Sequence, residues 1–173
     1  MPERGTSEFD ARDAGAAPAP ALSDDRRKSR QLLARWRDAR GDRAMPSWEC
    51  HGRVVGDLDA YCIMGHFGHD RAEAVTGKIG GFFLDRLEAG DGAQSTDPYP
   101  AAVVMGIIRS LGTQLLHGAT PILHEGEFQT DTGALIRYRT AVLPFGEPGH
   151  GPDHWLALGS WRSAVSDRAL RAA

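Results

Sequence analysis

Cysteine is scarce in this sequence of 173 residues, where only Cys50 and Cys62 occur. Two cysteines cannot build the disulfide framework that stabilises small secreted domains. A core made from this many residues needs neither disulfides nor a metal ion to be stable. We therefore expect a single domain, held together by hydrophobic packing, with terminal extensions.

An excess of basic side chains is also missing. The sequence has 20 Lys and Arg residues against 23 Asp and Glu residues, which gives a formal net charge of -3. Binding to nucleic acid requires a clustered basic surface that neutralises phosphates. We therefore expect no nucleic acid among the partners of this chain.

Long apolar runs are absent too, and the first five residues lead into acidic and small residues instead of an apolar leader segment. The best candidate for a membrane span, residues 99–108, has about half of the roughly 20 apolar residues that a span requires. Arg109 follows it directly. These absences predict a cytoplasmic protein without a membrane partner.

Composition divides the chain into four segments. Residues 1–21 are rich in Ala, Pro, Gly and charged residues, and such a segment cannot bury enough apolar surface to become ordered. We predict a disordered tail over 1–21, an N-terminal flanking helix over 22–46, a domain over 47–165 and a C-terminal tail over 166–173.

The flanking helix is basic with a narrow apolar stripe. Ser23 is a suitable N-cap, and Gly41 is expected to end the helix. Leu32, Leu33 and Trp36 recur at helical spacing. The stripe has two compatible interpretations: it packs on the domain, or it forms an interface with a second copy or another partner.

The remaining elements alternate between helical and strand patterns. Strands are predicted over 51–55 and 58–64, with a hairpin turn at Gly56 and Asp57. Short helices and turns follow over 66–89, then a loop over 90–98. A long helix is capped by Asp97 and Pro98, carries Ala102, Val103, Ile107, Leu111 and Leu115 on its apolar side, and ends at His117.

Three further strands are predicted over 122–128, 134–145 and 154–162. The last one is apolar on both faces, with Leu156 and Leu158 on one and Trp155 and Trp161 on the other. Such a strand is covered on both sides, and the helix that carries Trp36 is the natural second cover. Segregated antiparallel strands with helices predict an α+β domain.

Trp36, Arg40, Gly41, Arg43, Met45 and Pro46 spell W-x-x-x-R-G-x-R-x-M-P. This motif and the element order resemble small bacterial single-domain PAS-like proteins. The resemblance implies a five-stranded antiparallel sheet, helices on one face enclosing a small cavity, and an N-terminal flanking helix. It also implies a sensory or regulatory role in signal transduction through protein–protein interaction, and a homodimer, but no reaction. The segment Ser47–His51 departs from the family pattern.

A pocket between the sheet and the long helix follows from this expected geometry. Its candidate lining residues, which are core residues first, are Phe83, Ile107, Leu111, Ile136, Tyr138 and Leu158. Tyr138 offers a hydroxyl that could orient a small-molecule ligand. The sequence leaves the identity of any ligand or cofactor open.

Several histidines and cysteines invite a more specific chemistry. Cys50, His51, Cys62, His66, His69 and Asp70 resemble a loose set of zinc ligands, but no C-x-x-C pair anchors them. His117 and His124 are the candidates for haem ligation, and neither cysteine lies in a flavin-adduct motif. Without a C-x-x-C pair we expect no metal site. Since no acid–base pair or nucleophile motif is recognisable, we also expect no catalysis. A cofactor-binding sensor and a small α+β enzyme remain the alternatives.

Overall fold

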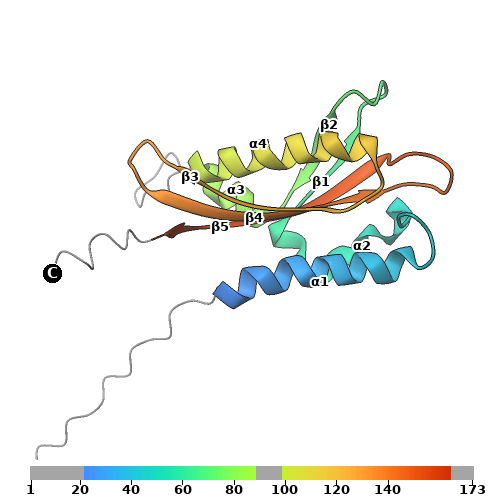
Figure 1. Cartoon of the computed structure of the whole chain (residues 1–173), viewed down its shortest axis with the longest axis horizontal. Helices are drawn as coiled ribbons and strands as arrows, with labels where there is room; N and C mark the ends of the chain where they lie inside the picture. Colours follow the sequence, from blue (N-terminus) through green and yellow to red (C-terminus); the bar gives the residue numbers. More distant parts are fainter. Residues whose placement is uncertain (1–21, 89–98, 165–173) are drawn as a thin grey trace, which may run out of the picture.

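The protein is described by a computed structural model that covers residues 22–88 and 99–164. Its strands form one antiparallel sheet in the order β2-β1-β5-β4-β3 (Figure 1). The strands are β1 (Cys62–Phe67), β2 (Ala74–Ile79), β3 (Ile122–Gln129), β4 (Leu135–Phe145) and β5 (His154–Ala164). The α-helices are α1 (Leu22–Arg40), α2 (His51–Val55), α3 (Gly81–Glu88) and α4 (Tyr99–Gln114). Three 3-10 turns complete them: η1 (Trp48–Cys50), η2 (Gly56–Tyr61) and η4 (Leu115–His117).

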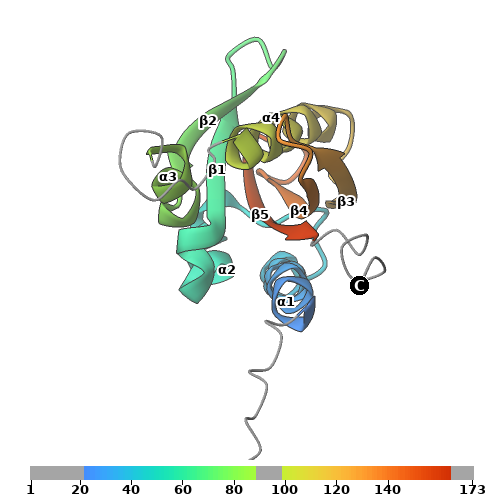
Figure 2. The same ribbon diagram turned by 90° about the vertical axis from the view of Figure 1, so that its left-hand side faces the viewer.

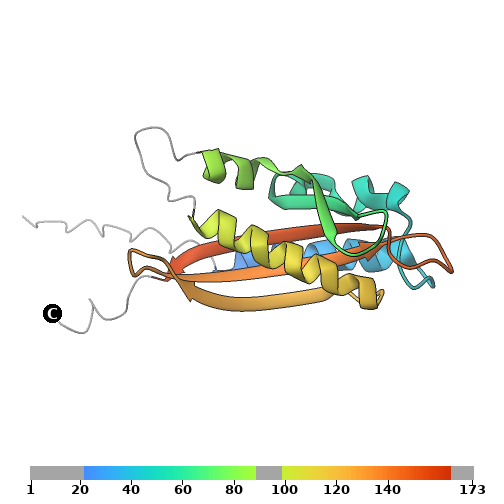
Figure 3. The same cartoon turned by 90° about the horizontal axis from the view of Figure 1, so that it is seen from above.

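The sheet is covered on both faces by helices (Figure 2). On one face, here called the outer face, α1 packs against β4 and β5 and α2 packs beside α1. On the inner face, α4 packs against β5, β4 and β2, with α3 beside it (Figure 3). This arrangement confirms the expected α+β class, the five-stranded antiparallel sheet and the flanking helix as second cover.

Strand β5 lies at the centre of the sheet and is buried on both faces. Trp155 and Ala157 belong to the inner-face core, whereas Leu156 and Leu158 belong to the outer-face core, and all four are 0% exposed. Because side chains alternate along a strand, an apolar residue at every position requires cover on both sides. The two helical layers supply that cover.

The first hairpin begins later than the sequence predicts. Residues 51–55 form helix α2 and residues 56–61 form η2, whereas strands were expected there. The strands of this hairpin are β1 and β2, so part of the predicted region of helices and turns is sheet.

Arg35 of α1 gives a physical reason for this error. Its guanidinium Nη1 donates a hydrogen bond to the carbonyl oxygen of Val55 at 2.9 Å, and its Nη2 lies 2.6 Å from Asp57 Oδ1. A helix end leaves carbonyl groups that need donors from elsewhere. A distant helix therefore caps α2, and the local pattern of the segment does not contain that information. The hydrogen bond that Arg35 Nη2 donates to Asp57 Oδ1 lowers the pKa of the Asp57 carboxyl.

In its N-terminal half the long helix has its buried face about one residue away from the predicted stripe, whereas Leu111 and Leu115 are buried as predicted. The buried side chains include Ala101, Val104, Ile108 and Leu111, whereas Ala102 is exposed and Val103 and Ile107 are only half-buried. This helix has few charges, so several rotations suit its composition equally well. Packing against the sheet selects one of them. Its predicted cap, Asp97 and Pro98, lies outside the described residues, as do the loop 90–98 and both predicted tails.

The apolar stripe of α1 is buried against the sheet. Leu32, Leu33 and Trp36 are 0%, 8% and 1% exposed. Trp36 Nε1 donates a hydrogen bond to the carbonyl oxygen of Pro144 in β4 at 2.8 Å. The packing interpretation of the stripe is therefore correct, and these three side chains are not available to a second copy in this arrangement.

Replacing Trp36 by Ala removes both this hydrogen bond and the largest buried side chain of the helix. We expect Trp36→Ala to lower the free energy of unfolding by about 3–5 kcal/mol, measured by urea denaturation. The exposed Arg30→Ala serves as control and should change it by less than about 0.5 kcal/mol. If Trp36→Ala left the stability intact and only split a dimer, α1 would be an interface and not a cover.

Candidate functional site

The structure brings together most of the predicted pocket residues on the inner face. Phe83 and Leu111 are buried in the inner-face core, and Ile107 and Tyr138 pack against it. Ile136 is 3% exposed and lies two residues from Tyr138 on the same side of β4. Whether these residues bind a ligand stays a prediction.

Leu158 does not lie among them. It belongs to the outer-face core with Trp36 and Leu143. In β5 the inner neighbour of Tyr138 is Trp161, which pairs with it in the strand register. The prediction placed Leu158 on the wrong face, because a shift of one residue along a strand moves a side chain to the opposite side.

The inner face is filled where the pocket was expected. A Cβ atom at Gly159 would lie 2.8 Å from Phe83 Cζ, 2.9 Å from Ile108 Cδ1 and 3.3 Å from Val104 Cγ1. Side chains from α3 and α4 thus rest directly on the backbone of β5. At this position the space between the helices and the sheet is occupied by the protein itself.

The hydroxyl of Tyr138 points to the edge of the sheet and not to the interior. Its Oη lies 3.3 Å from His124 Nδ1 on β3, and the ring covers Gly126, whose missing side chain makes room for it. Burial raises the pKa of the Tyr138 hydroxyl. The hydroxyl that was predicted to orient a ligand therefore contacts His124 of the neighbouring strand.

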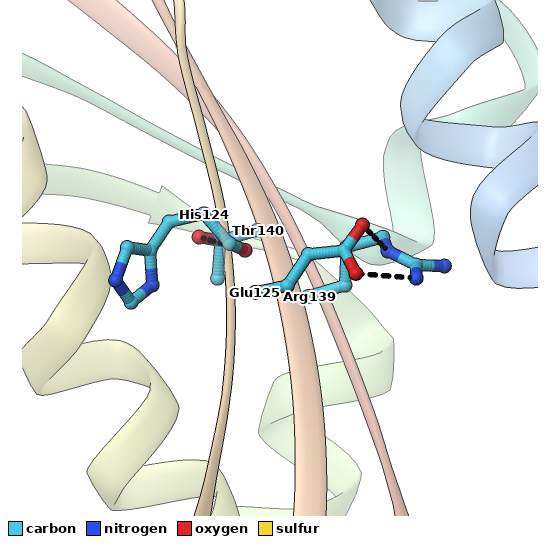
Figure 4. A network of polar contacts seen from close by, with 4 residues as sticks. All are labelled: His124, Glu125, Arg139 and Thr140. Carbon is cyan, nitrogen blue, oxygen red and sulfur yellow. Dashed lines mark hydrogen bonds and ion pairs between the residues drawn. The ribbon is translucent and has the colours of Figure 1, made fainter.

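The side chains of His124 and Glu125, which are adjacent in β3, point to opposite faces of the sheet, as Figure 4 shows. His124 points toward α4, whereas Glu125 points toward the side of α1 and forms two hydrogen bonds with Arg139, at 2.6 and 2.8 Å. Thr140 contacts the backbone oxygen of His124. This outer side of β3 and β4 is polar, and sequence reasoning did not single it out as a site.

The outward face of α1 is basic. Among the described side chains of this face, Arg27, Arg30 and Arg37 are exposed around Ala34, and Asp38 is the only acidic one. No ion pair joins any of these three arginines to another residue of the described part of the chain. The helix thus has one face buried on the sheet and an opposite face that carries unpaired positive charge.

The Trp48 ring lies between two histidine rings and stacks on both. This arrangement was not predicted from the sequence. The Trp48 ring stacks on His51 at a centroid distance of 4.2 Å and on His154 at 4.5 Å. His51 Nδ1 lies 2.7 Å from the carbonyl oxygen of Trp48, and His154 Nδ1 lies 2.9 Å from Asp153 Oδ1. These contacts join η1, α2 and β5 at one end of the sheet.

The candidate metal ligands are not gathered into a site. Among residues 22–88 and 99–164, no group of three or more His, Cys, Asp or Glu side chains could hold a metal ion. His66 lies in β1 and His69 in the turn after it, so they do not share a helix face. His117 and His124, the candidates for haem ligation, are both exposed.

Comparisons with known proteins add little to this description. No protein-family model matches the sequence, and no curated protein matches it. The chain is similar in structure to the PAS domain of Bordetella pertussis BvgS, with 12% identity, a TM-score of 0.38, and coverage of 72% of this chain and 90% of that one. It is also similar to the light-state blue-light photoreceptor Aureochrome1 LOV domain, with 11% identity, a TM-score of 0.34, and coverage of 69% and 92%. The α+β class follows from the chain's own five-stranded sheet and from the helices on its two faces.

No helix in the described part of the chain is long and apolar enough to cross a membrane.

The packed inner face predicts opposite effects for two Gly→Ala substitutions. Gly159→Ala should lower the free energy of unfolding by about 1–3 kcal/mol, because its methyl group would overlap Phe83 and Ile108. Gly106→Ala in α4 meets no atom within 4 Å. This control should raise the stability by about 0.5–1 kcal/mol through helix propensity. Urea denaturation measures both, and a tolerated Gly159→Ala would indicate an open cavity.

The two cysteines should differ in reactivity. Cys62 is 1% exposed, and burial raises the pKa of its thiol from 9.0 to about 12. A thiol reagent at pH 8 should therefore label the half-buried Cys50 first, since the thiolate is the reactive form.

The same shift predicts how stability depends on pH. The pKa of Cys62 is higher in the folded state, so its contribution is fully present below about pH 9 and is lost as the pH rises from 9 toward 12. Across this range the native chain should lose stability relative to Cys62→Ala, as measured by urea midpoints. A constant difference between the two would contradict the burial of this thiol.

Proposed function

We propose that this chain is a non-catalytic regulatory module, with a PAS-like fold, that acts by binding another protein through the outward face of α1. The observation that supports the proposal most directly is the division of α1 into two faces. One face is buried against β4 and β5, and the other carries three exposed arginines.

The buried face gives α1 a fixed position on the sheet. Leu32 and Trp36 pack among β-sheet side chains, and the hydrogen bond from Trp36 to Pro144 fixes the helix along β4. Arg35 adds a second attachment through Val55 and Asp57. A partner bound to the outward face would therefore be coupled mechanically to the strands, which suits a module that transmits a signal.

The charge of the outward face defines the partner's chemistry. Arg27, Arg30 and Arg37 fall within about one quarter of the helix circumference at 3.6 residues per turn. Exposed charges of one sign accelerate association with a surface of opposite sign and add specificity. We infer a protein partner with an acidic surface.

A homodimer remains part of the proposal, but it would use another surface. Two copies of α1 facing each other would place like charges together, and such a juxtaposition is unfavourable. Leu32, Leu33 and Trp36 are buried within the chain. The dimer predicted from the apolar stripe therefore needs a different contact.

A cofactor-binding sensor of the same fold is less well supported than the interaction module. The two candidate haem ligands, His117 and His124, are exposed, and Gly159 is covered by side chains of the chain itself. A small enzyme would need an acid–base pair in a pocket. An absorbance spectrum of the purified chain tests the sensor alternative, since haem or flavin absorbs visible light.

Site-specific crosslinking tests the partner surface. A photoreactive residue at the exposed position 34 of the full chain, in its native cells, should crosslink to one acidic protein, and the yield should fall as salt is raised. The variant Arg27→Glu/Arg30→Glu/Arg37→Glu should reduce this yield by about tenfold, equivalent to about 1.4 kcal/mol.

The matched control uses Arg53, which is exposed on α2. Arg53→Glu should leave the yield unchanged, and a photoreactive residue at position 53 should give different products. Equal products from both positions, or full yield from the triple variant, would refute α1 as the contact surface.

A further inference from the structure

A shallow polar pocket of about 290 Å³ opens on the outer face of β3, β4 and β5. Its charged and hydroxyl side chains come from two cross-strand rows of the sheet. The register gives these rows as Glu125–Arg139–Ser160 and Glu127–Arg137–Arg162. The neighbouring row contains the apolar residues Ala141 and Leu158, both of which are fully buried.

Ser160 lies at the base of this pocket with an unsatisfied hydroxyl. The residue is 3% exposed, and its Oγ has no hydrogen-bond partner. A buried hydroxyl without a partner is unfavourable by about 1–3 kcal/mol. A ligand in the pocket that accepts a hydrogen bond from the Ser160 hydroxyl would satisfy this group.

Arg162 is the second feature that lacks a partner. No ion pair joins it to any other described residue, and it lies directly opposite Arg137 in the register of β4 and β5. Side chains at such positions are about 5 Å apart at Cβ, and like charges there destabilise a sheet. A negative group between the two guanidinium groups would remove this repulsion.

The other charges of the pocket are largely matched. Arg139 is held by Glu125 through two hydrogen bonds, and its side chain is 18% exposed. Glu127 lies 3.4 Å from Arg137, which is a long contact for an ion pair. Among the described residues, three arginines and two glutamates line the pocket. Arg162 lies two residues from Ser160 on the same face of β5.

We propose that this pocket binds a small molecule through a phosphate group, with Arg162, Arg137 and Ser160 as its donors. A terminal phosphate has three acceptor oxygens and up to two negative charges at neutral pH. It can therefore take hydrogen bonds from two guanidinium groups and a hydroxyl together. A carboxylate has two oxygens, which a single guanidinium fork already satisfies.

The position of the pocket makes the proposal distinct from the partner surface. Ligands of PAS-like folds are expected between the helices and the sheet, whereas this pocket lies on the opposite face. It uses β3, β4 and β5 and none of the three outward arginines of α1. Binding of phosphate here does not require a protein partner, so either proposal can fail without the other.

Inorganic phosphate is a suitable probe for the full chain. Two-dimensional amide NMR spectra recorded with increasing phosphate, at constant ionic strength, should show saturable shifts confined to β3, β4 and β5. Arg162→Gln should weaken binding by about tenfold or more, because it removes the unpaired charge. Ser160→Ala should also weaken binding while leaving the free protein as stable or more stable, since it removes an unsatisfied group.

Two further variants separate this site from general attraction to positive charge. Glu127→Gln should strengthen binding severalfold, because it removes a negative charge that faces the ligand. Arg53→Gln removes an arginine elsewhere and should leave phosphate affinity unchanged. Shifts spread over α1 and other basic surfaces, or equal affinity in Arg162→Gln and the native chain, would overturn the proposal.

Discussion

The burial of β5 on both faces is the constraint on which the rest of this structure depends. Trp155 and Leu156 are neighbours in the chain, yet each is fully buried in a different core. A strand of this kind is stable only between two covering layers. Helix α4 supplies one layer, and α1 supplies the other through Trp36 and its hydrogen bond to Pro144. The flanking helix is thus an integral part of the domain.

The outer face changes character along its length. Toward the C-terminal half of β4 it is apolar and covered by α1, as Leu143 and Phe145 show. Toward the N-terminal half it carries Arg137 and Arg139 and opens into the polar pocket. The buried helix contact and the pocket therefore share two strands. A ligand in the pocket and a partner on α1 would act on the same part of the sheet from neighbouring positions.

The inner face is closely packed at Gly159, where the family resemblance implies a cavity. Phe83, Val104 and Ile108 fill the space over Gly159, and the Tyr138 hydroxyl is engaged by His124. This face contributes a packed core and an aromatic cluster around Phe82, Phe83 and Trp161. Arg162, which has no ion-pair partner among the described residues, and the unsatisfied Ser160 hydroxyl lie on the outer side of the molecule.

The sequence by itself determined the α+β class, the flanking helix and the last three strands. In the first half of β4 polar and apolar residues alternate, with Arg137 and Arg139 against Ile136 and Tyr138, and a period of two specifies both strand and face. The tertiary structure decided where local patterns are ambiguous or where distant residues act. Arg35 caps α2 from another helix, and packing chose the rotation of α4. The pocket around Ser160 arises from three strands in register, because pairing between distant segments, and no local pattern, brings its residues together.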